Sequence, residues 1–279
     1  CGKTTCLTAD RKEFVPLDRV IHELSDYFQT HDDPDYITFS GSGEPTLYTK
    51  LKEVMAFIKQ TKPDIRMAVL TNATLFNDPD VCTTLLAADR VVPSLDAATR
   101  DAFERINRPA TDVDLAGMIQ GMADFSSKYK GEFFLEVMIL PGLNDRPEDL
   151  AELRKAIHRI RPDRVQLNTL DRPGTRPGLS AATTDEMMKI GRMIDYPSWE
   201  IIARKKAKKN VKGSREDIDT AIIETVRRRP STREDLIGAL GASPRNVDQC
   251  IKALEKKGVL KKERLDQQEF FRLSRKDHR

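Results

Sequence analysis

The segment SGSGEP at residues 40–45 leaves the apolar run DYITF through two glycines, an acid and a proline. Gly41 and Gly43 have no Cβ atom, so this loop can adopt positive φ and its amides can approach a ligand closely. Glu44 adds a carboxylate that suits a cationic group, and Pro45 restricts the backbone at the exit from the loop. A Gly-rich turn is also a common simple connection, so its role depends on the residues that surround it.

Four later apolar runs also end in residues that can bind a ligand. Thr71-Asn72, Ser94-Leu95-Asp96, PGLND at 141–145 and Asn168 each follow such a run. Parallel α/β sheets and barrels bind their ligands at the carboxyl ends of the strands. Each of these residues can instead cap the helix that follows it. As a set, they favour one binding site at the ends of five strands.

The elements that position these residues alternate along the chain up to residue 202. Apolar runs predict strands at 36–39, 67–70, 90–93, 133–139, 164–167 and 199–202, and amphipathic stretches predict helices at 16–30, 47–61, 78–87, 98–105, 111–129, 146–160 and 184–195. This alternation is typical of βα units around a parallel sheet, an α/β fold. The chain starts with a loop and a helix, so a first strand is missing from the pattern.

The charge of the sequence is unevenly distributed. Residues 203–279 contain 22 Lys and Arg against 12 Asp and Glu, a balance of +10, whereas the whole chain carries only +3. Such a basic region suggests a polyanionic partner. Residues 203–215 (ARKKAKKNVKGSR) have no apolar face, which predicts a basic linker or an exposed tail between two domains.

Residues 216–279 are predicted to form a second, small domain. Three amphipathic helical patterns precede a hairpin at 259–264 and 269–273. The third helix starts with Ser243 as its N-cap and Pro244 at its first helical position. This order resembles a winged helix-turn-helix, whose third helix, here 243–257, would face a nucleic-acid groove. Phosphate-binding charge would come from Arg245, Lys252, Lys256, Lys257, Lys261, Lys262 and Arg264. A protein-interaction or dimerisation module of the same fold is the alternative.

Six motifs of the first 202 residues occur in a characteristic order. DYITFSGSGEPTL, AVLTNATLF, VVPSLDA, INRP, LEVMILPGLND and RVQLNTLDRPGT together resemble a branch of the radical S-adenosylmethionine (SAM) superfamily that is related to wyosine-type tRNA modification enzymes. The resemblance implies a partial (β/α)6 TIM-type barrel, here without its first strand. It also implies SAM, a [4Fe–4S] cluster and a reductant such as ferredoxin or flavodoxin. Cleavage of SAM would then give a 5′-deoxyadenosyl radical that abstracts hydrogen from a substrate.

The resemblance assigns SAM contacts to individual residues. Gly41, Ser42, Gly43, Glu44 and Pro45 match the family's Gly-Gly-Glu-Pro loop, which binds the methionyl ammonium group. Thr71, Asn72, Ser94 and Asp96 match positions near the carboxylate and ribose of SAM, and Gln166 and Asn168 lie where the adenine edge is met. Arg108 in INRP is a candidate partner for a carboxylate, or a solvated surface charge.

The cluster motif C-x-x-x-C-x-x-C of this superfamily is absent from the chain. Cys1 and Cys6 are separated by four residues and would leave a cluster one ligand short. Cys82 and Cys250 lie in helical patterns and are interpreted as small buried residues. We therefore predict no metal ligand within the chain and expect the cluster cysteines upstream of Cys1, through N-terminal truncation. A natural protein that has lost its cluster is the alternative.

Two functions of different class remain. The first is a radical SAM enzyme with an unknown substrate, with RNA as a candidate, and the second is a non-catalytic SAM-sensing regulator that binds nucleic acid. With 39% hydrophobic and 33% charged residues, the sequence is typical of a globular protein. It contains no apolar run near the ~18 residues of a membrane span and no signal-peptide pattern at its start. These features predict a cytoplasmic protein with no membrane partner.

Overall fold

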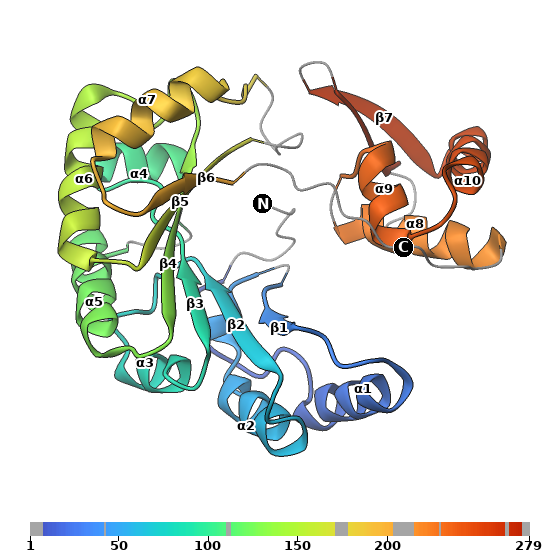
Figure 1. Ribbon diagram of the computed structural model, residues 1–279, viewed down its shortest axis with the longest axis horizontal. Coiled ribbons are helices and arrows are strands. Elements are labelled where there is room, and N and C mark those ends of the chain that lie inside the picture. Colours follow the sequence, from blue (N-terminus) through green and yellow to red (C-terminus); the bar gives the residue numbers. More distant parts are fainter. Residues whose placement is uncertain are drawn as a thin grey trace. The chain divides into compact units, whose positions relative to one another are not determined.

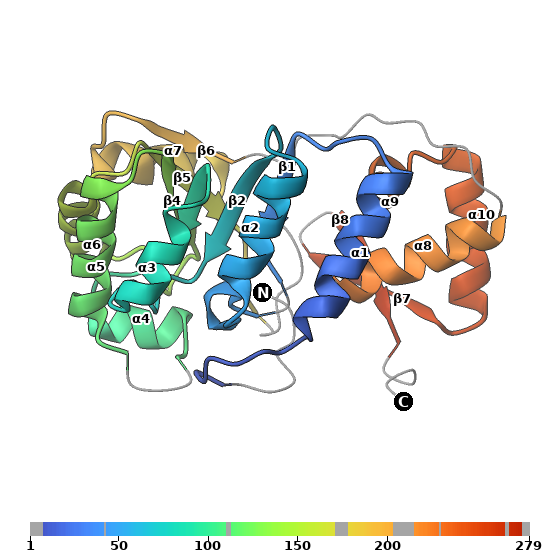
Figure 2. The ribbon, with the colours of Figure 1, turned by 90° about the horizontal axis from the view of Figure 1, so that it is seen from below.

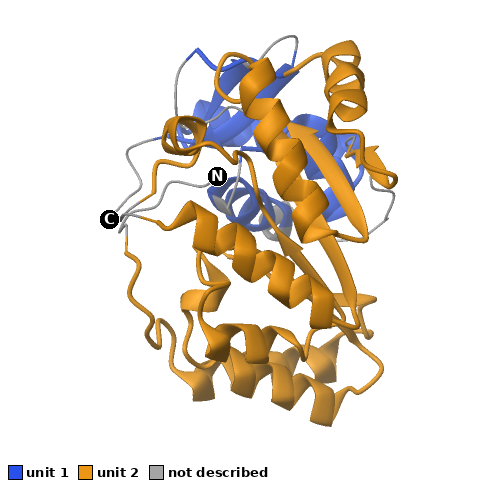
Figure 3. Ribbon diagram, turned by 90° about the vertical axis from the view of Figure 1, so that its left-hand side faces the viewer, with its two compact units in different colours: residues 1–3, 170–181, 203–279 blue, residues 4–169, 182–202 orange. Residues whose placement is uncertain are grey.

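A computed structural model describes residues 8–41, 43–109, 113–170, 178–202, 215–228, 230–265 and 268–274. The described residues form two compact units (Figure 3). Residues 8–169 and 182–202 make the first, called the sheet unit, and residues 215–274 make most of the second, called the C-terminal unit. The predicted linker falls almost entirely on residues 203–214, which lie outside the described residues.

Six parallel strands form the sheet of the first unit. In chain order they are β1 (Tyr36–Phe39), β2 (Arg66–Thr71), β3 (Arg90–Pro93), β4 (Glu132–Ile139), β5 (Arg164–Thr169) and β6 (Trp199–Ile201). Each strand pairs with the next one in the sequence, so the order in the sheet is β1-β2-β3-β4-β5-β6. This confirms the predicted α/β fold with a parallel sheet, and it brings the carboxyl ends of all strands to one edge.

Helices cover the outer side of the curved sheet (Figure 1). They are α1 (Leu17–Thr30), α2 (Leu51–Thr61), α3 (Pro79–Leu85), α4 (Arg100–Ile106), α5 (Leu115–Lys128), α6 (Pro147–Ile160) and α7 (Thr184–Ile194). In the view from below, α5 lies beside α6 and α1 beside α2 (Figure 2), in agreement with the contacts between these helices. None of the helices in the described residues combines the length and the apolar composition of a membrane span.

The core of the sheet unit lies between the sheet and these helices. Along β4, the side chains of Phe133, Leu135, Val137 and Ile139 are at most 2% exposed and face the helices. The alternating residues Glu136 and Met138 are partly exposed on the other face of the sheet. Because successive strand residues point to opposite faces, the same alternation buries the apolar core and leaves polar side chains on the inner face.

The helix predicted at 47–61 starts later than expected. Pro45–Leu47 forms a 3-10 turn, η1, and α2 begins only at Leu51. The Glu44 side chain accepts a hydrogen bond from the Thr46 backbone N–H and so caps this turn. A tertiary constraint on the loop after β1 therefore shortens the helix that the apolar pattern alone predicts.

The C-terminal unit contains three helices followed by an antiparallel hairpin. They are α8 (Arg215–Arg228), α9 (Arg233–Leu240) and α10 (Pro244–Lys256), with β7 (Leu260–Leu265) pairing with β8 (Gln268–Leu273). Ile222, Leu236 and Val247 contribute one fully buried side chain from each helix to its core. The unit thus has a hydrophobic core of its own.

Candidate SAM site at the strand ends

Glu44 fixes the loop after β1 to the end of β2. Its Oε1 accepts hydrogen bonds from the Thr46 N–H at 3.1 Å, the Thr46 hydroxyl at 2.7 Å and the Thr71 hydroxyl at 2.6 Å. Its Oε2 accepts from the Asn72 N–H at 2.6 Å. Four hydrogen bonds to one carboxylate hold Glu44 and the turn after it against the end of β2, since such charge-assisted bonds are the stronger ones.

The glycines of this loop leave its backbone exposed. Neither Gly41 nor Gly43 has a positive φ, so the loop does not use the left-handed conformation that glycine allows. A Cβ atom on Gly43 would find no other atom within 4 Å, and one on Gly41 would make ordinary contacts with the Gly43 backbone. The loop therefore leaves open space beside Gly43, on exposed backbone that a ligand can reach. Ser42 lies outside the described residues.

Asp96 joins the end of β3 to β4 and α4. Its Oδ1 accepts a hydrogen bond from the Met138 N–H at 2.9 Å, and its Oδ2 accepts one from Asn107 Nδ2 at 3.0 Å. The pKa of Asp96 is raised to about 6, chiefly by burial and also by the nearby Glu136, against the opposing effect of these two hydrogen bonds. The ionised carboxylate is thus destabilised in the free chain, a condition that a cationic ligand would relieve.

Asn144 holds the ends of β3 and β4 together. It is 1% exposed, and its Nδ2 donates to the carbonyl oxygens of Asp96 and Met138 at 2.7 Å each. Its Oδ1 accepts from the Leu140 N–H at 2.9 Å. The sequence placed PGLND at the binding edge but assigned Asn144 no role. An asparagine among turn residues directly after a buried strand is the signal that could have identified it.

A second support for the same loop comes from α4. Arg105 donates to the Leu143 carbonyl oxygen at 3.1 Å from Nε and 3.0 Å from Nη2. Arg105 also pairs with Asp149 of α6 at 3.1 Å, and Asp149, 6% exposed, accepts a hydrogen bond from the Thr99 hydroxyl at 2.6 Å. The loop after β4 is therefore tied to both of the helices that flank it.

Glu136 and Asn168 meet on the inner face between β4 and β5. Asn168 Nδ2 donates to Glu136 Oε1, while Asn168 Oδ1 is buried and has no hydrogen-bond partner among the described residues. A buried acceptor without a donor is costly unless a ligand or a water supplies one. Glu136 was not identified from the sequence, because its place beside Ser94 and Asn168 depends on strand pairing.

The remaining predicted residues lie at different distances from the strand-end groups described above. Ser94 donates its backbone N–H to the Thr71 carbonyl oxygen at 2.9 Å, which places it at the same edge. Gln166 lies on β5 two residues before Asn168, further from the strand end, and its Nε2 donates to Glu200 at 2.9 Å. Arg108 is exposed, has a positive φ of 44°, and forms no ion pair with any other described residue.

Contacts thus connect the strand ends in succession from β1 to β5, through Glu44, Ser94, Asp96 and Asn168. The cysteines are not part of this row. Cys250 is buried as predicted, Cys82 is only half-buried, and Cys1 and Cys6 lie outside the described residues. Across the part of the chain that the structure describes, no three His, Cys, Asp or Glu residues lie close enough together to hold a metal ion.

Comparisons with known proteins relate the chain to several relatives. It is 35% identical over 258 residues to a protein of Brachyspira hyodysenteriae named GTPase Obg, a match that covers 90% of this chain and 37% of that protein. It is 35% identical over 172 residues to a UPF0026 protein of Synechocystis sp., covering 62% of this chain and 63% of that one. The chain therefore spans between about a third and two thirds of the length of these relatives.

The fold is also similar to that of a solved structure. A radical SAM methyltransferase from Sphaerobacter thermophilus superposes with a TM-score of 0.50 and 14% identity, over 66% of this chain and 55% of that protein. At this identity the likeness concerns the fold alone. Residues 6–154, which are more than half of the chain and carry the strand-end residues from Gly41 to Asn144, match the Radical SAM superfamily. The chain belongs to the radical SAM superfamily.

Proposed function

We propose that this chain is the SAM-binding part of a radical SAM enzyme that abstracts hydrogen from a substrate. The observation that carries the proposal is the continuous row of ligand-binding groups from Glu44 to Asn168, in a chain of this superfamily. When bound, SAM and a [4Fe–4S] cluster supply a 5′-deoxyadenosyl radical. The residues of this chain would bind SAM, orient it and exclude water around it.

The groups present in the row fit the polar parts of SAM. The exposed backbone beside Gly43 suits the methionyl ammonium, while Glu44 stays behind the loop, because its oxygens already bind four donors. Asn72, Ser94 and Asp96 are the candidates for the carboxylate and ribose. The unpartnered Asn168 Oδ1 matches an amino donor such as that of adenine. Pro45 orients the loop, and Gln166 supports the inner wall through Glu200.

The described residues do not fit a [4Fe–4S] cluster. A cluster requires three cysteine thiolates besides SAM, and the described cysteines are Cys82 and Cys250, one in each unit. The proposal therefore places the cluster ligands outside the described residues, and it assigns no step of the reaction to a cluster ligand of this chain.

The test is anaerobic reconstitution of the protein expressed from its whole gene, with SAM and dithionite. We expect formation of 5′-deoxyadenosine, measured by mass spectrometry, and a loss of about tenfold or more in its rate at low SAM for Asn168→Ala. Asn246→Ala, which changes an exposed asparagine of the C-terminal unit, is the matched control and should behave as the wild type. No 5′-deoxyadenosine at full iron loading would contradict the proposal.

We also propose that the C-terminal unit is a winged helix-turn-helix that binds nucleic acid. Arg245, Gln249, Lys252 and Lys256 follow one exposed stripe of α10, and their side chains form no ion pair with other described residues. Lys262 and Arg264 of the hairpin are instead paired with Glu269. Unpaired cations on one helix face favour phosphate contacts there. RNA is the candidate substrate, in keeping with the predicted wyosine-related branch.

Fluorescence anisotropy with a tRNA and with a DNA duplex of equal charge tests this second proposal. Lys252→Ala with Lys256→Ala should reduce the slope of log K against log salt by about 1 for each phosphate that α10 no longer neutralises. Arg264→Ala, which removes a paired cation, is the control and should change the slope less. Equal slopes for all three proteins would remove the role of α10, and tighter binding of DNA would favour a regulatory target over RNA.

The alternative function, a SAM-sensing regulator without catalysis, predicts a different combination of results. Such a protein would bind SAM and nucleic acid but would form no 5′-deoxyadenosine under any reductant. The name of the Brachyspira relative does not extend a GTPase activity to this chain, which spans 37% of it. A cytoplasmic location and a ferredoxin or flavodoxin as reductant remain part of the proposal.

A further inference from the structure

The segment before α1 is hydrogen-bonded to the backbone at the end of η1. The Lys12 N–H donates to the Leu47 carbonyl oxygen at 3.0 Å, and the Thr49 N–H donates to the Lys12 carbonyl oxygen at 3.2 Å. These two bonds form a parallel bridge between Lys12 and Tyr48 that is separate from the six-stranded sheet. Residues 11–15, which include this bridge, are called the N-terminal clamp.

Two side chains strengthen the clamp. The Tyr48 hydroxyl donates to the Val15 carbonyl oxygen at 2.9 Å. Arg11 pairs through Nη1 with Asp78 Oδ2 at 2.9 Å, and the two side chains are 30% and 29% exposed. Asp78 is the N-cap of α3, where its Oδ1 accepts from two backbone N–H groups. The clamp is therefore tied both to the end of η1 and to the start of α3.

The helix that follows the clamp adds little to hold this part of the chain. All of α1 is described, and none of its residues is buried. Its apolar face packs only partly buried side chains against the core, those of Leu17, Val20, Leu24 and Phe28. By comparison, the shorter helix α2 has four buried side chains. Segments with few buried apolar contacts open locally while the rest of a domain stays folded. The position of residues 8–30 therefore depends on the clamp, whose loss leaves the core of the sheet unit intact.

The backbone that the clamp holds continues directly from Glu44. Thr46 is 2% exposed and donates both its N–H and its hydroxyl to Glu44 Oε1. The other carboxylate oxygen of Glu44 accepts from the Asn72 N–H, just after the end of β2. A continuous set of bonds therefore leads from the clamp to Asn72, through the turn that carries Glu44.

We propose that the N-terminal clamp positions Glu44 and the SAM-binding loop before it, with Arg11 and Tyr48 as positioning residues. The proposal rests on the proposed function, since it concerns the same SAM site. Both side chains act through the backbone at residues 47–49, and a clamp that is already formed spares SAM the cost of ordering this backbone. Such a coupling is reciprocal, so the factor by which the clamp raises the affinity for SAM is also the factor by which SAM stabilises the clamp.

A simpler role for these contacts is to fasten α1 to the sheet unit. In that case, loss of the clamp would speed amide hydrogen exchange at Lys12 and Thr49, whose N–H groups form the bridge. It would leave the Asn72 N–H unaffected, because this group is bonded to Glu44 and not to the clamp. The two roles therefore differ in their effect on one amide at the end of β2.

Amide hydrogen exchange followed by NMR tests the proposal without any ligand. In Tyr48→Phe and in Arg11→Ala, the Asn72 N–H should exchange at least about fivefold faster than in the wild type, the factor that corresponds to releasing one ordered backbone residue. Tyr48→Phe keeps the ring and removes only the hydroxyl bond to Val15, so the core is unchanged. Arg11→Lys retains a cation opposite Asp78 and should restore most of the protection.

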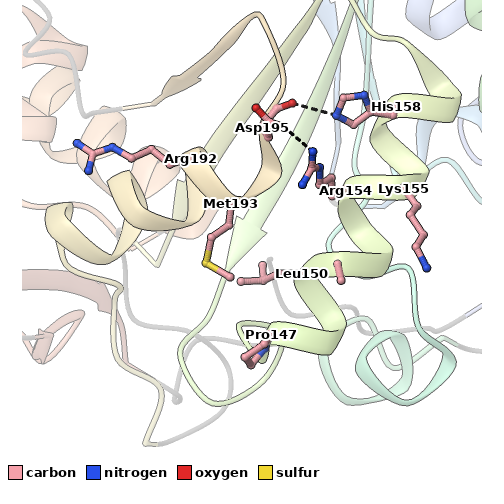
Figure 4. A pocket seen from close by; sticks show the side chains of 9 residues that line it. Pro147, Leu150, Arg154, Lys155, His158, Arg192, Met193 and Asp195 are labelled. Carbon is pink, nitrogen blue, oxygen red and sulfur yellow. Dashed lines mark hydrogen bonds and ion pairs between the residues drawn. The ribbon is translucent and has the colours of Figure 1, made fainter.

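Arg154→Ala is the matched control. Figure 4 shows Arg154 of α6 bonded to Asp195, the residue that ends α7, in the groove between these two helices. Like Arg11→Ala, the change removes an Arg–Asp pair that joins two elements, but it does so near the amino end of β6 and not at the carboxyl ends of the strands. It should leave exchange at Asn72 as in the wild type. Unchanged exchange in both clamp variants, or an equal increase in Arg154→Ala, would overturn the proposal.

A second measurement separates this proposal from the proposed function. With the reconstituted whole-gene protein, Arg11→Ala should bind SAM at least about fivefold more weakly in equilibrium dialysis, and SAM should slow exchange of the Lys12 N–H in the wild type. Wild-type affinity in Arg11→Ala would refute the coupling of the clamp to SAM. No binding of SAM by the wild type would refute the proposed function instead, while exchange at Asn72, which needs no ligand, would still decide whether the clamp positions Glu44.

Discussion

Replacing Asp96 with asparagine should make the stability of the sheet unit less dependent on pH. The folded protein raises the pKa of Asp96 from 3.8 to about 6. It therefore binds this proton more tightly than the unfolded chain does. The contribution of Asp96 to stability is fully present below pH 4 and is lost as the pH rises to about 6. A difference of roughly two pKa units corresponds to about 3 kcal/mol.

The expected result is a difference curve. The free energy of unfolding of Asp96→Asn minus that of the wild type should increase by up to about 3 kcal/mol between pH 4 and pH 7. The new amide faces Asn107 Nδ2, which adds a constant offset that does not depend on pH. Urea denaturation followed by tryptophan fluorescence measures the sheet unit selectively, because Trp199 of β6 is the single tryptophan of the sequence.

Taking the difference between two proteins removes the contributions of other titrating groups. Asp64→Asn, at an exposed position between α2 and β2, is the control and should give a flat difference curve. A flat curve for Asp96→Asn as well would refute the reasoning that burial destabilises its ionised form. If SAM binds here, its positive charge favours ionised Asp96, so SAM affinity of the wild type should rise as the pH passes about 6.

Three further substitutions test the packing of the sheet unit and the space beside Gly43. Asn144→Ala removes three hydrogen bonds to the backbone, one of them to the buried Leu140 N–H, and should reduce the free energy of unfolding by about 3 kcal/mol, measured by urea denaturation. Gly121→Ala places a Cβ atom 2.3 Å from the Phe76 carbonyl oxygen and should destabilise by about 1–3 kcal/mol; stabilisation, the usual result of Gly→Ala within a helix, would contradict this close approach. Gly43→Ala should leave the thermal midpoint within about 2 °C, because the new Cβ meets no other atom of the protein within 4 Å. It should weaken SAM binding in equilibrium dialysis, because the new Cβ fills the open space beside Gly43 that the ligand would occupy.

Local patterns in the sequence were sufficient to locate the sheet. All six predicted strands are present, with ends within two residues of those observed, because apolar alternation and the turn residues after each strand are local properties. The polar strand ends were also placed on one edge correctly, since parallel strands with sequential order leave no other arrangement.

The contacts within the site could not be predicted in the same way. Glu136 meets Asn168 only through the pairing of β4 with β5, and Asn144 binds Asp96 across 48 residues of sequence. The contacts of Glu44 with the backbone and hydroxyl groups of its own chain likewise have no signal in the sequence. Such partners depend on tertiary distances, which neither periodicity nor spacing contains.

The four hydrogen bonds of Glu44 also affect how tightly a ligand can bind. Fixing a residue of a flexible loop costs about 1–2 kcal/mol of conformational entropy. Because the Glu44 carboxylate already joins the loop to Thr71 and Asn72 in the free chain, most of this entropy is lost during folding. A ligand then meets a preorganised surface, and more of its contact energy remains as affinity.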